Sequence, residues 1–379
     1  MIYLDNAATS FPKPRGVIEE QMRCMRQYCG NPGRGAHRLS LAAAEKIYAC
    51  RELIADTFGA SAERVCFTQN TTTALNIAIK GLLCEGDHVL ISDMEHNAVY
   101  RPVARLASEG RITYDVFPTF PLSPDRSTAR ICTAIAHLIR PNTKMLICAH
   151  ASNICSATLP IKEIGALCHK KGILFVVDAA QSAGHLPIDV TKMRIDALCV
   201  PGHKGLLGPQ GCGFVVWGED VSADTLIEGG SGFHSLDAQM PEEAPERFEA
   251  GTLPTPAIAG LCEGIREVRE IGLEAVERHE RELNERLFAM LSTLPDLCIC
   301  APLHRGSILS FVCDRIPSDR LAAELDRRGF CVRAGFHCSA LGHRTLQTPD
   351  GGALRVSPGI YTKSTDIDAF FHAMREILT

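Results

Sequence analysis

An aspartate and a lysine stand out as a pair that could do chemistry together. The apolar run at positions 173–177 ends in Asp178, and Lys204 follows 26 positions later, between His203 and a glycine-rich turn. An unbroken aliphatic run is typical of a buried parallel strand, and open α/β sheets bind their ligands at the carboxyl ends of such strands. We therefore expect Asp178 and Lys204 to meet in one crevice at the edge of a sheet.

Such a pair suits pyridoxal phosphate, which a lysine holds as a Schiff base while an acid keeps the ring nitrogen protonated. Asp178 and Gln181 form an Asp-x-x-Gln motif, and residues 201–205 read Pro-Gly-His-Lys-Gly. A strand-end aspartate alone is usually a cap, and a lone Gly-His-Lys is usually a loop. In their order and spacing the two motifs resemble class V of the fold-type I pyridoxal phosphate enzymes, in the branch of cysteine desulfurases and selenocysteine lyases.

The resemblance implies contacts to the cofactor from several parts of the chain. Residues 69–73, Gln-Asn-Thr-Thr-Thr, follow a predicted strand and open a predicted helix, where free N–H groups and the helix dipole favour a phosphate. A threonine N-cap would account for one of these hydroxyls. The residues that the resemblance assigns to the cofactor are Thr71, Thr72, His96, Asn153, Asp178, Gln181, His203, Lys204 and Thr252.

Some of these residues have further roles in the family. His96 matches a histidine that stacks on the cofactor ring and moves protons, while Asn153 and Gln181 match contacts to its phenolic oxygen. Thr252 lies in a segment by which each subunit of a homodimer reaches the phosphate of its partner. The segments at 3–9 and 31–37 resemble the two amino-terminal motifs of the family, the first of which lines the mouth of the active site.

One position departs from the pattern of the family. Two residues before the histidine, relatives commonly have Ser or Thr, whereas this chain has Pro201. Proline offers neither a hydroxyl nor an N–H group. We therefore predict that one phosphate contact is missing and that the cofactor is retained more weakly.

Cys338 is the cysteine that we expect to act as a nucleophile. Most of the 17 cysteines lie inside apolar runs, where free thiols behave as small hydrophobic groups. Cys338 lies in the polar passage 333–339, which resembles the Arg-x-Gly-x-His-Cys of group II desulfurases and selenocysteine lyases. A desulfurase needs an exposed thiolate that takes sulfur as a persulfide.

The resemblance also implies which residues bind the carboxylate of the substrate. Arg355 matches the arginine that clamps the α-carboxylate with two parallel hydrogen bonds, and Arg333 is a second candidate for the same pocket. Asn153 matches a residue near that carboxylate.

Apolar strands alternate with amphipathic helices through the first two-thirds of the chain, which predicts a mainly parallel sheet covered on both faces. We expect a seven-stranded sheet in an α/β, fold-type I large domain at 16–254, after an active-site segment at 1–15 and before a small α+β domain at 255–379. Residues 229–245 read as a loop or lid. The expected strands are 65–68, 89–92, 113–117, 144–149, 173–178, 197–200, 213–217, 298–301, 308–313, 331–334 and 353–357, and the expected helices are 39–57, 72–83, 98–107, 127–139, 161–170, 255–294, 319–328 and 365–378.

Composition excludes several other classes of protein. The 379 residues are 46% hydrophobic and 22% charged, with a net charge of −5 and scattered basic residues, so we expect no nucleic-acid or membrane partner. Neither a signal-peptide pattern nor a spanning apolar run is visible, and we expect a cytoplasmic protein. The absence of any Cys-x-x-Cys argues against a metal site.

The expected activity is removal of sulfur from L-cysteine, which gives L-alanine and a persulfide on Cys338. The sulfur would pass to an acceptor protein, in a pathway such as iron–sulfur cluster assembly. A lyase acting on L-selenocysteine, a cystine C–S lyase and an aminotransferase share Asp178 and Lys204. Their products distinguish these alternatives from a desulfurase.

Overall fold

The computed structural model describes residues 1–33, 35–124, 126–301 and 306–378. Arg34 of the 31–37 motif lies outside the described residues. The centre of the structure is a seven-stranded sheet. All strands but β8 run parallel, and β8 is antiparallel to both of its neighbours. In spatial order the strands are β2 (Val65–Thr68), β8 (Gly213–Trp217), β7 (Ala197–Pro201), β6 (Leu174–Asp178), β5 (Thr143–Ala149), β3 (His88–Ser92) and β4 (Thr113–Phe117).

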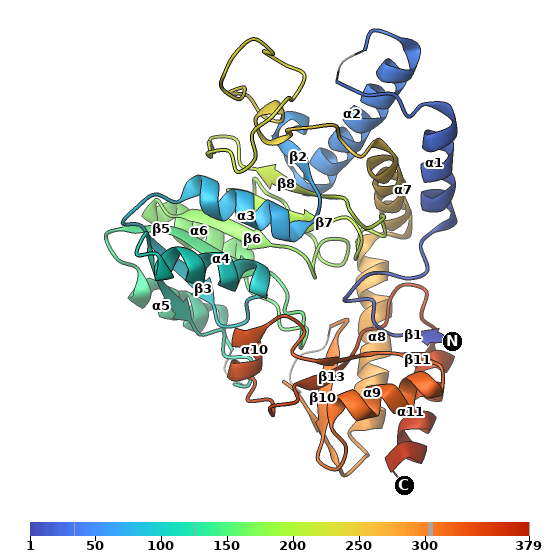
Figure 1. Ribbon diagram of the computed structural model, residues 1–379. Coiled ribbons are helices and arrows are strands. Elements are labelled where there is room, and N and C mark those ends of the chain that lie inside the picture. The colour runs from blue at the N-terminus through green and yellow to red at the C-terminus, as the bar shows by residue number, and fades with distance from the viewer. Residues whose placement is uncertain (34, 125, 302–305, 379) are drawn as a thin grey trace.

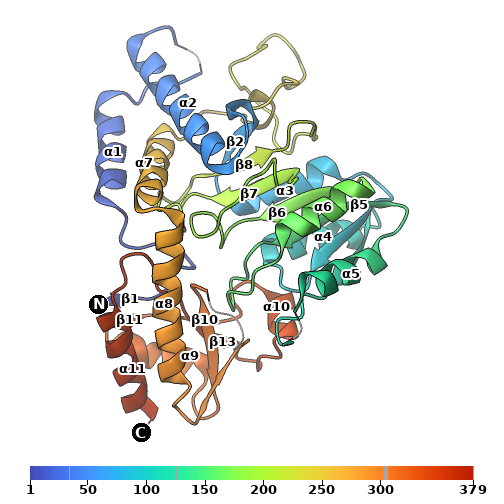
Figure 2. The same cartoon turned by 180° about the vertical axis from the view of Figure 1, so that it is seen from behind.

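Helices cover both faces of this sheet, as Figures 1 and 2 show. Alternate residues of a strand point to opposite faces, so Val176 packs in one core cluster and Phe175 and Val177 in the other. One face carries α3 (Thr71–Leu82) and α4 (Asn97–Ser108). The other carries α2 (Arg38–Phe58), α5 (Thr128–Leu138), α6 (Ile161–Lys171) and α7 (Thr255–Ile271). The predicted α/β architecture is therefore confirmed.

A separate core forms in the C-terminal part of the chain. Its antiparallel sheet has the order β12 (Arg333–Gly335), β13 (Ala353–Val356), β10 (Leu309–Cys313) and β9 (Leu297–Ile299). The helices α8 (Leu273–Leu291), α9 (Ser318–Arg327) and α11 (Ser364–Leu378) pack against it. The N-terminus returns to this part, because β1 (Ile2–Tyr3) pairs in parallel with β11 (Phe330–Cys331) and Leu4 is buried in the same core.

The structure differs from the predicted elements in a few places. The long helix expected at 255–294, for which the sequence left a break open, is two helices, because Gly272 adopts a φ of +86° between α7 and α8. The strand expected at 331–334 is divided between β11 and β12, which belong to different sheets. Two helices were not predicted, α1 (Arg15–Gln27), which packs on α7, and the short α10 (Ala340–Thr345). Residues 229–245 contain no helix or strand, as expected.

The described residues contain neither a membrane-spanning helix nor a cluster of metal ligands. No helix is both long and apolar enough to cross a membrane. No group of three or more histidine, cysteine, aspartate or glutamate side chains is arranged to hold a metal ion.

Candidate active site

Asp178 and Lys204 line one cavity of about 90 Å³ at the carboxyl edge of the central sheet. Asp178 is the last residue of β6, and Lys204 lies in the turn between β7 and β8. The expected meeting of these two side chains in one crevice is therefore observed. The other residues around the cavity come from neighbouring strand ends and helix starts: Asn70, Thr71, Thr72, His96, Ala98, Ala149, Ala151, Asn153, Ala180, Gln181, Pro201 and His203.

Burial changes the proton affinity of both groups. It lowers the pKa of Lys204 to about 8, against the attraction of Asp178 and with help from the positive charges of Arg355 and Arg333. Burial also raises the pKa of Asp178, although the Ala180 N–H, 2.9 Å from Oδ1, and the charge of Lys204 oppose the rise. At neutral pH a larger fraction of such an amine is unprotonated than of an ordinary lysine, and only the unprotonated form acts as a nucleophile or base.

The start of helix α3 presents free donors to this cavity. Asn70, not a threonine, is its N-cap, and the Asn70 side chain accepts from the Thr73 N–H at 3.0 Å. The threonine cap considered from the sequence is therefore wrong. Thr71 is buried with an unpartnered hydroxyl, and Thr72 also lines the cavity. Uncommitted hydroxyls at a helix N-terminus favour a bound anion.

His203 contributes a second unpartnered atom, its buried Nδ1. Burial and the charges of Lys204 and Lys13 lower the pKa of His203 to about 4. The imidazole is therefore neutral at physiological pH and can donate to or accept from a ligand. The adjacent Pro201 lines the same cavity at the end of β7 without offering a polar side chain.

His96 and Glu95 follow β3 at the neighbouring strand end. His96 is the N-cap of α4 and its Nδ1 accepts from the Ala98 N–H at 3.0 Å, so Nε2 carries the proton in the neutral ring. Burial and nearby cations lower the pKa of His96 to about 4. Glu95 is fully buried and accepts from the Ala149 N–H at 2.9 Å, and burial raises its pKa to about 8. Sequence reasoning named His96 but missed Glu95.

Arg355 lies on β13 and is 2% exposed. Its Nη1 donates to the Asn153 carbonyl at 3.0 Å and its Nη2 to Asp5 Oδ1 at 2.8 Å, while its buried Nε has no partner. The contact with Asp5 was not predicted as an interaction, because 350 residues separate the two positions. Arg333 lies opposite Arg355 in the β12–β13 pairing, and its charge acts on Lys204 and His96.

Cys338 lies on the loop between β12 and α10 and is exposed. The backbone reaches this position through two consecutive left-handed residues, His337 at φ +48° and Cys338 at φ +56°. The Cys338 carbonyl accepts from the Asn97 N–H at 2.7 Å, next to His96, and Asn153 Nδ2 donates to the His337 carbonyl at 2.7 Å. The loop is thus joined directly to the rim of the Lys204 cavity.

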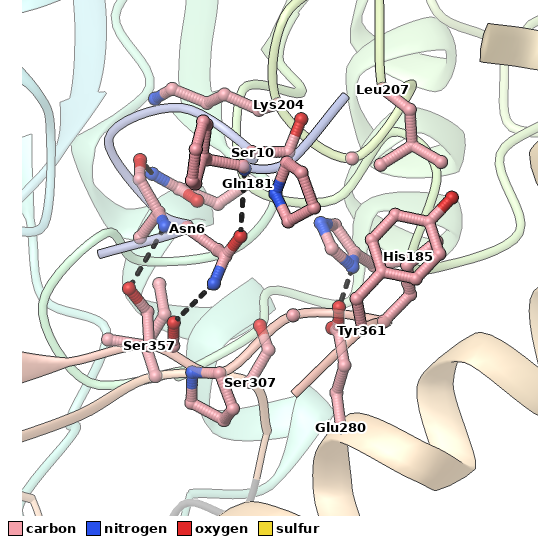
Figure 3. A pocket seen from close by; sticks show the side chains of 18 residues that line it. Asn6, Ser10, Gln181, His185, Lys204, Leu207, Glu280, Ser307, Ser357 and Tyr361 are labelled. Carbon is pink, nitrogen blue, oxygen red and sulfur yellow. Dashed lines mark hydrogen bonds and ion pairs between the residues drawn. The ribbon is translucent and has the colours of Figure 1, made fainter. Parts of the chain in front are cut away.

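A smaller cavity of about 20 Å³ lies beside the first and shares Gln181 and Lys204 with it (Figure 3). Gln181 Nε2 donates to the Ala7 carbonyl at 2.9 Å, which joins the amino-terminal segment to the site. On the far side of this cavity, His185 Nδ1 lies 2.8 Å from Glu280 Oε2 of α8. Neither His185 nor Glu280 was singled out from the sequence.

Thr252 is the one predicted cofactor residue that lies away from both cavities. It is exposed and lines a separate pocket of about 290 Å³ with residues of α2 and of the segment near Gly230. Glu249, three residues earlier, forms a buried ion pair with Arg51 and accepts from the Phe67 N–H at 2.6 Å. Within one chain, therefore, Thr252 does not meet Lys204.

Comparison with known proteins gives consistent matches over almost the whole chain. The model of the family described as Aminotransferase class-V matches residues 2–370. A probable cysteine desulfurase of Methanothermobacter thermautotrophicus is 34% identical over 99% of this chain and 94% of the relative, and a cysteine desulfurase of Yersinia pestis is 31% identical over 100% and 93%.

Solved structures are similar over the same extent. The apo structure of a cysteine desulfurase from Thermococcus onnurineus NA1 superposes with a TM-score of 0.90 at 30% identity, over 100% of this chain and 94% of the other. The cysteine desulfurase CsdA from Escherichia coli superposes with a TM-score of 0.87 at 24% identity, over 100% and 95%, a likeness of fold alone.

Proposed function

The chain belongs to the class-V aminotransferase family, and from this premise we propose that it is a pyridoxal phosphate-dependent cysteine desulfurase. It removes sulfur from L-cysteine, releases L-alanine and keeps the sulfur as a persulfide on Cys338. The observation that carries this proposal is the match, at 31–34% identity over nearly full length, to curated relatives named cysteine desulfurase. An exposed cysteine joined to the rim of a buried lysine and aspartate site supports it.

The residues of the cavity fit pyridoxal phosphate. The unpartnered Thr71 hydroxyl and His203 Nδ1, with Thr72 at the same helix start, suit a phosphate group. Asp178 suits a protonated ring nitrogen, Lys204 suits the aldehyde, and His96 and Gln181 lie at the same cavity. When bound, pyridoxal phosphate supplies an electron sink that makes the substrate Cα–H acidic.

Lys204 acts as the base that moves the proton at the substrate Cα. Its lowered pKa of about 8 leaves a substantial neutral fraction near physiological pH. Asp178 lines the same cavity, where the Ala180 N–H and the charge of Lys204 favour its ionised form against the rise in pKa that burial causes, and a protonated ring nitrogen would favour it further. His96 holds its proton on Nε2, because its Nδ1 is committed to the backbone of α4.

Arg355 orients the substrate through its α-carboxylate. Its Nη groups are already held by Asn153 and Asp5, and Nε is the buried donor without a protein partner among the described residues. A carboxylate that accepts from Nε satisfies this atom and fixes the substrate relative to Lys204. Arg333 adds positive charge to the same region.

Cys338 then receives the sulfur. Its thiolate attacks the substrate Sγ, a sulfur–sulfur bond forms, and the bond between the substrate Cβ and Sγ breaks. The electron pair of that bond stays with the substrate fragment, which takes up protons and leaves as L-alanine. The exposure of Cys338 lets a sulfur-acceptor protein collect the persulfide in a later thiol exchange.

Finer features of the proposal rest on family resemblance. We propose a homodimer in which Thr252 reaches the phosphate of the partner subunit, which agrees with its distance from the cavities of its own chain. Delivery to iron–sulfur cluster assembly and a cytoplasmic location remain predictions from the sequence.

A product assay on the cofactor-loaded protein tests the proposal. With L-cysteine, wild type yields alanine, Cys338→Ala loses at least about 90% of this turnover because the acceptor thiolate is missing, and Lys204→Ala yields none. With L-selenocysteine, Cys338→Ala is expected to keep activity because selenium leaves without an attacking thiolate. Pyruvate, a transaminated keto acid, or alanine formed equally by Cys338→Ala would overturn the assignment in favour of a lyase or an aminotransferase.

A further inference from the structure

The carbonyl oxygen of His203 accepts an unusual number of hydrogen bonds. Lys13 Nζ lies 2.8 Å from it, and Thr9 Oγ1, Ser10 Oγ and the Ser10 N–H each lie 3.1 Å from it. A carbonyl oxygen has only two lone pairs, so these donors exceed what it can accept at full strength. All of them come from one short stretch at the amino terminus, whereas the carbonyl immediately precedes Lys204.

Lys13 is an unusual cation to find in this place. It is half-buried, its other hydrogen bond within the described residues is to Ser10 Oγ at 2.7 Å, and no carboxylate of these residues forms an ion pair with it. Burial lowers the pKa of Lys13 to about 8, so the ammonium form still prevails at neutral pH. Removing a cation from water without a counterion costs free energy. Here the ammonium group of Lys13 instead donates to the peptide carbonyl of His203.

The stretch that carries these donors is itself fixed in place. Tyr3 donates its hydroxyl to the Thr9 carbonyl at 2.9 Å, and Asn6 Oδ1 accepts from the Phe11 N–H at 3.2 Å. Beyond Lys13, Pro14 begins helix α1. The donors therefore reach the His203 carbonyl from a loop whose conformation is fixed by its own hydrogen bonds.

The held carbonyl determines where Lys204 begins. A peptide unit is planar, so fixing the His203 carbonyl also fixes the direction of the Lys204 N–Cα bond. The remainder of the turn has backbone hydrogen bonds from Gly202 N–H to the Cys212 carbonyl at 2.9 Å, from Leu207 N–H to the Lys204 carbonyl at 2.8 Å and from Gly208 N–H to the Gly202 carbonyl at 2.8 Å. Ser10 and Lys204 both line the small cavity (Figure 3).

We propose that Lys13 is a positioning residue for Lys204: with Thr9 and Ser10, its ammonium group holds the carbonyl of the His203–Lys204 peptide and so aims the Lys204 side chain into the active-site cavity. This inference rests on the proposed role of Lys204 as the residue that takes the cofactor. It does not depend on cysteine being the substrate.

The test compares Lys13→Met with Lys13→Arg and with Arg15→Met. Methionine keeps the length of the stem but removes the charge and the donors, and arginine keeps both. Arg15 is the matched control, because it lies two positions further on, is 89% exposed, and pairs only with Glu19 at 2.5 Å. The readout is the rate at which the cofactor-free protein combines with pyridoxal phosphate, followed by its visible absorbance over a range of pH.

Lys13→Met is expected to combine with the cofactor between about tenfold and a hundredfold more slowly, the cost of a misdirected reacting group. Lys13→Arg should recover most of the wild-type rate, and Arg15→Met should equal wild type. Thr9→Val, which removes one neutral donor from the same carbonyl, should show a smaller loss in the same direction and covers the case in which Lys13→Met does not fold.

A purely structural Lys13 gives a different pattern. Lys13→Met would then unfold at a lower temperature than Arg15→Met but combine with pyridoxal phosphate at the wild-type rate and with the wild-type pH dependence. That result would overturn the proposal. Because the readout involves no turnover of cysteine, it separates failure of this inference from failure of the desulfurase assignment.

Discussion

At the scale of single residues, Pro201 is the position at which the sequence predicts that a contact to the cofactor phosphate is missing. Pro201 is the buried last residue of β7, pairs with Gly213 of β8, and lines the Lys204 cavity beside His203 and Thr72. A serine there would place a hydroxyl near the unpartnered Thr71 hydroxyl and His203 Nδ1.

We predict that Pro201→Ser binds pyridoxal phosphate more tightly than wild type. One added hydrogen bond to a charged phosphate is worth about 1.5–3 kcal/mol, or roughly a tenfold to hundredfold lower dissociation constant. Measurement is by equilibrium dialysis of the cofactor-free proteins, with Pro201→Ala as the control for loss of the ring alone. Equal dissociation constants for wild type and Pro201→Ser would show that the missing contact is compensated.

At the scale of elements, the loop that carries Cys338 is held by a chain of neutral histidines. The Arg333 carbonyl lies 3.3 Å from His337 Nε2 and can only accept a hydrogen bond, so His337 carries its hydrogen on Nε2. His337 Nδ1 is then free to accept a hydrogen bond from His343 Nε2–H at 3.2 Å. His343 Nδ1 then accepts from the Thr348 hydroxyl at 2.8 Å. Burial lowers the pKa of His337 to about 3 and of His343 to about 4, which keeps this pattern intact.

We predict that His343→Asn weakens the loop without emptying the cofactor site. The shorter amide leaves His337 Nδ1 without its donor, which costs about 1–3 kcal/mol, and the left-handed backbone at 337–338 is less well held. Single-turnover persulfide formation on Cys338 should fall several-fold, while cofactor binding stays at the wild-type level. The exposed His372→Asn serves as control. An unchanged persulfide yield at equal cofactor content would count against this role of His343.

The elements themselves were predictable to different degrees. Strands such as β3 and β6 were found from sequence because they are apolar runs buried on both faces, whereas the edge strand β4 (Thr113–Phe117) is mostly exposed or half-buried. Helix α1 was missed because it buries only Val17, Glu20 and Cys24, and α10 because six residues give no period to detect. Motif residues such as Asp178 and Lys204 were found, but Lys13, Glu95 and His185 act through partners that lie far away in the chain. No local sequence pattern indicates which residues far apart in the chain will be in contact.

At the scale of the whole molecule, the two structural cores meet at the site. Asp5 and Arg355, and His185 and Glu280, join residues of the central-sheet part or the amino terminus to the C-terminal part. The His185 ring also packs against the Lys204 turn, since a Cβ on Gly205 would come within 2.5 Å of its Nε2. The division at residue 255 remains a prediction: α7 packs in the core of the large sheet and α8 in the C-terminal core.

The His185–Glu280 pair should make the stability of the molecule depend on pH. Burial and the charge of Lys204 oppose protonation of His185, but Glu280 outweighs them and raises the pKa of His185 above the ordinary histidine value of about 6.5. A raised pKa in the folded state contributes stability that is complete below about 6.5 and is lost as the pH rises through the folded value. Glu277 of α8 lines a neighbouring cavity with His185 and Glu280, and it forms an ion pair with Arg281 at 3.0 Å.

We therefore predict that Glu280→Gln is destabilised near pH 6 by about 1.5–3 kcal/mol, the loss of a charged hydrogen bond to the half-buried His185, and by less near pH 9, where the proton that Glu280 favours on His185 is more readily lost. Chemical denaturation at equal protein concentration measures this difference, with Glu277→Gln as a control that removes the same charge one turn earlier. A loss of stability in Glu280→Gln that is the same at both pH values would mean that the side chains are held by packing and hydrogen bonding alone. A loss confined to low pH would mean that the ion pair between His185 and Glu280 helps to hold the two cores together beside Lys204. Lowering the pH would then stabilise the contact between the two cores at the site.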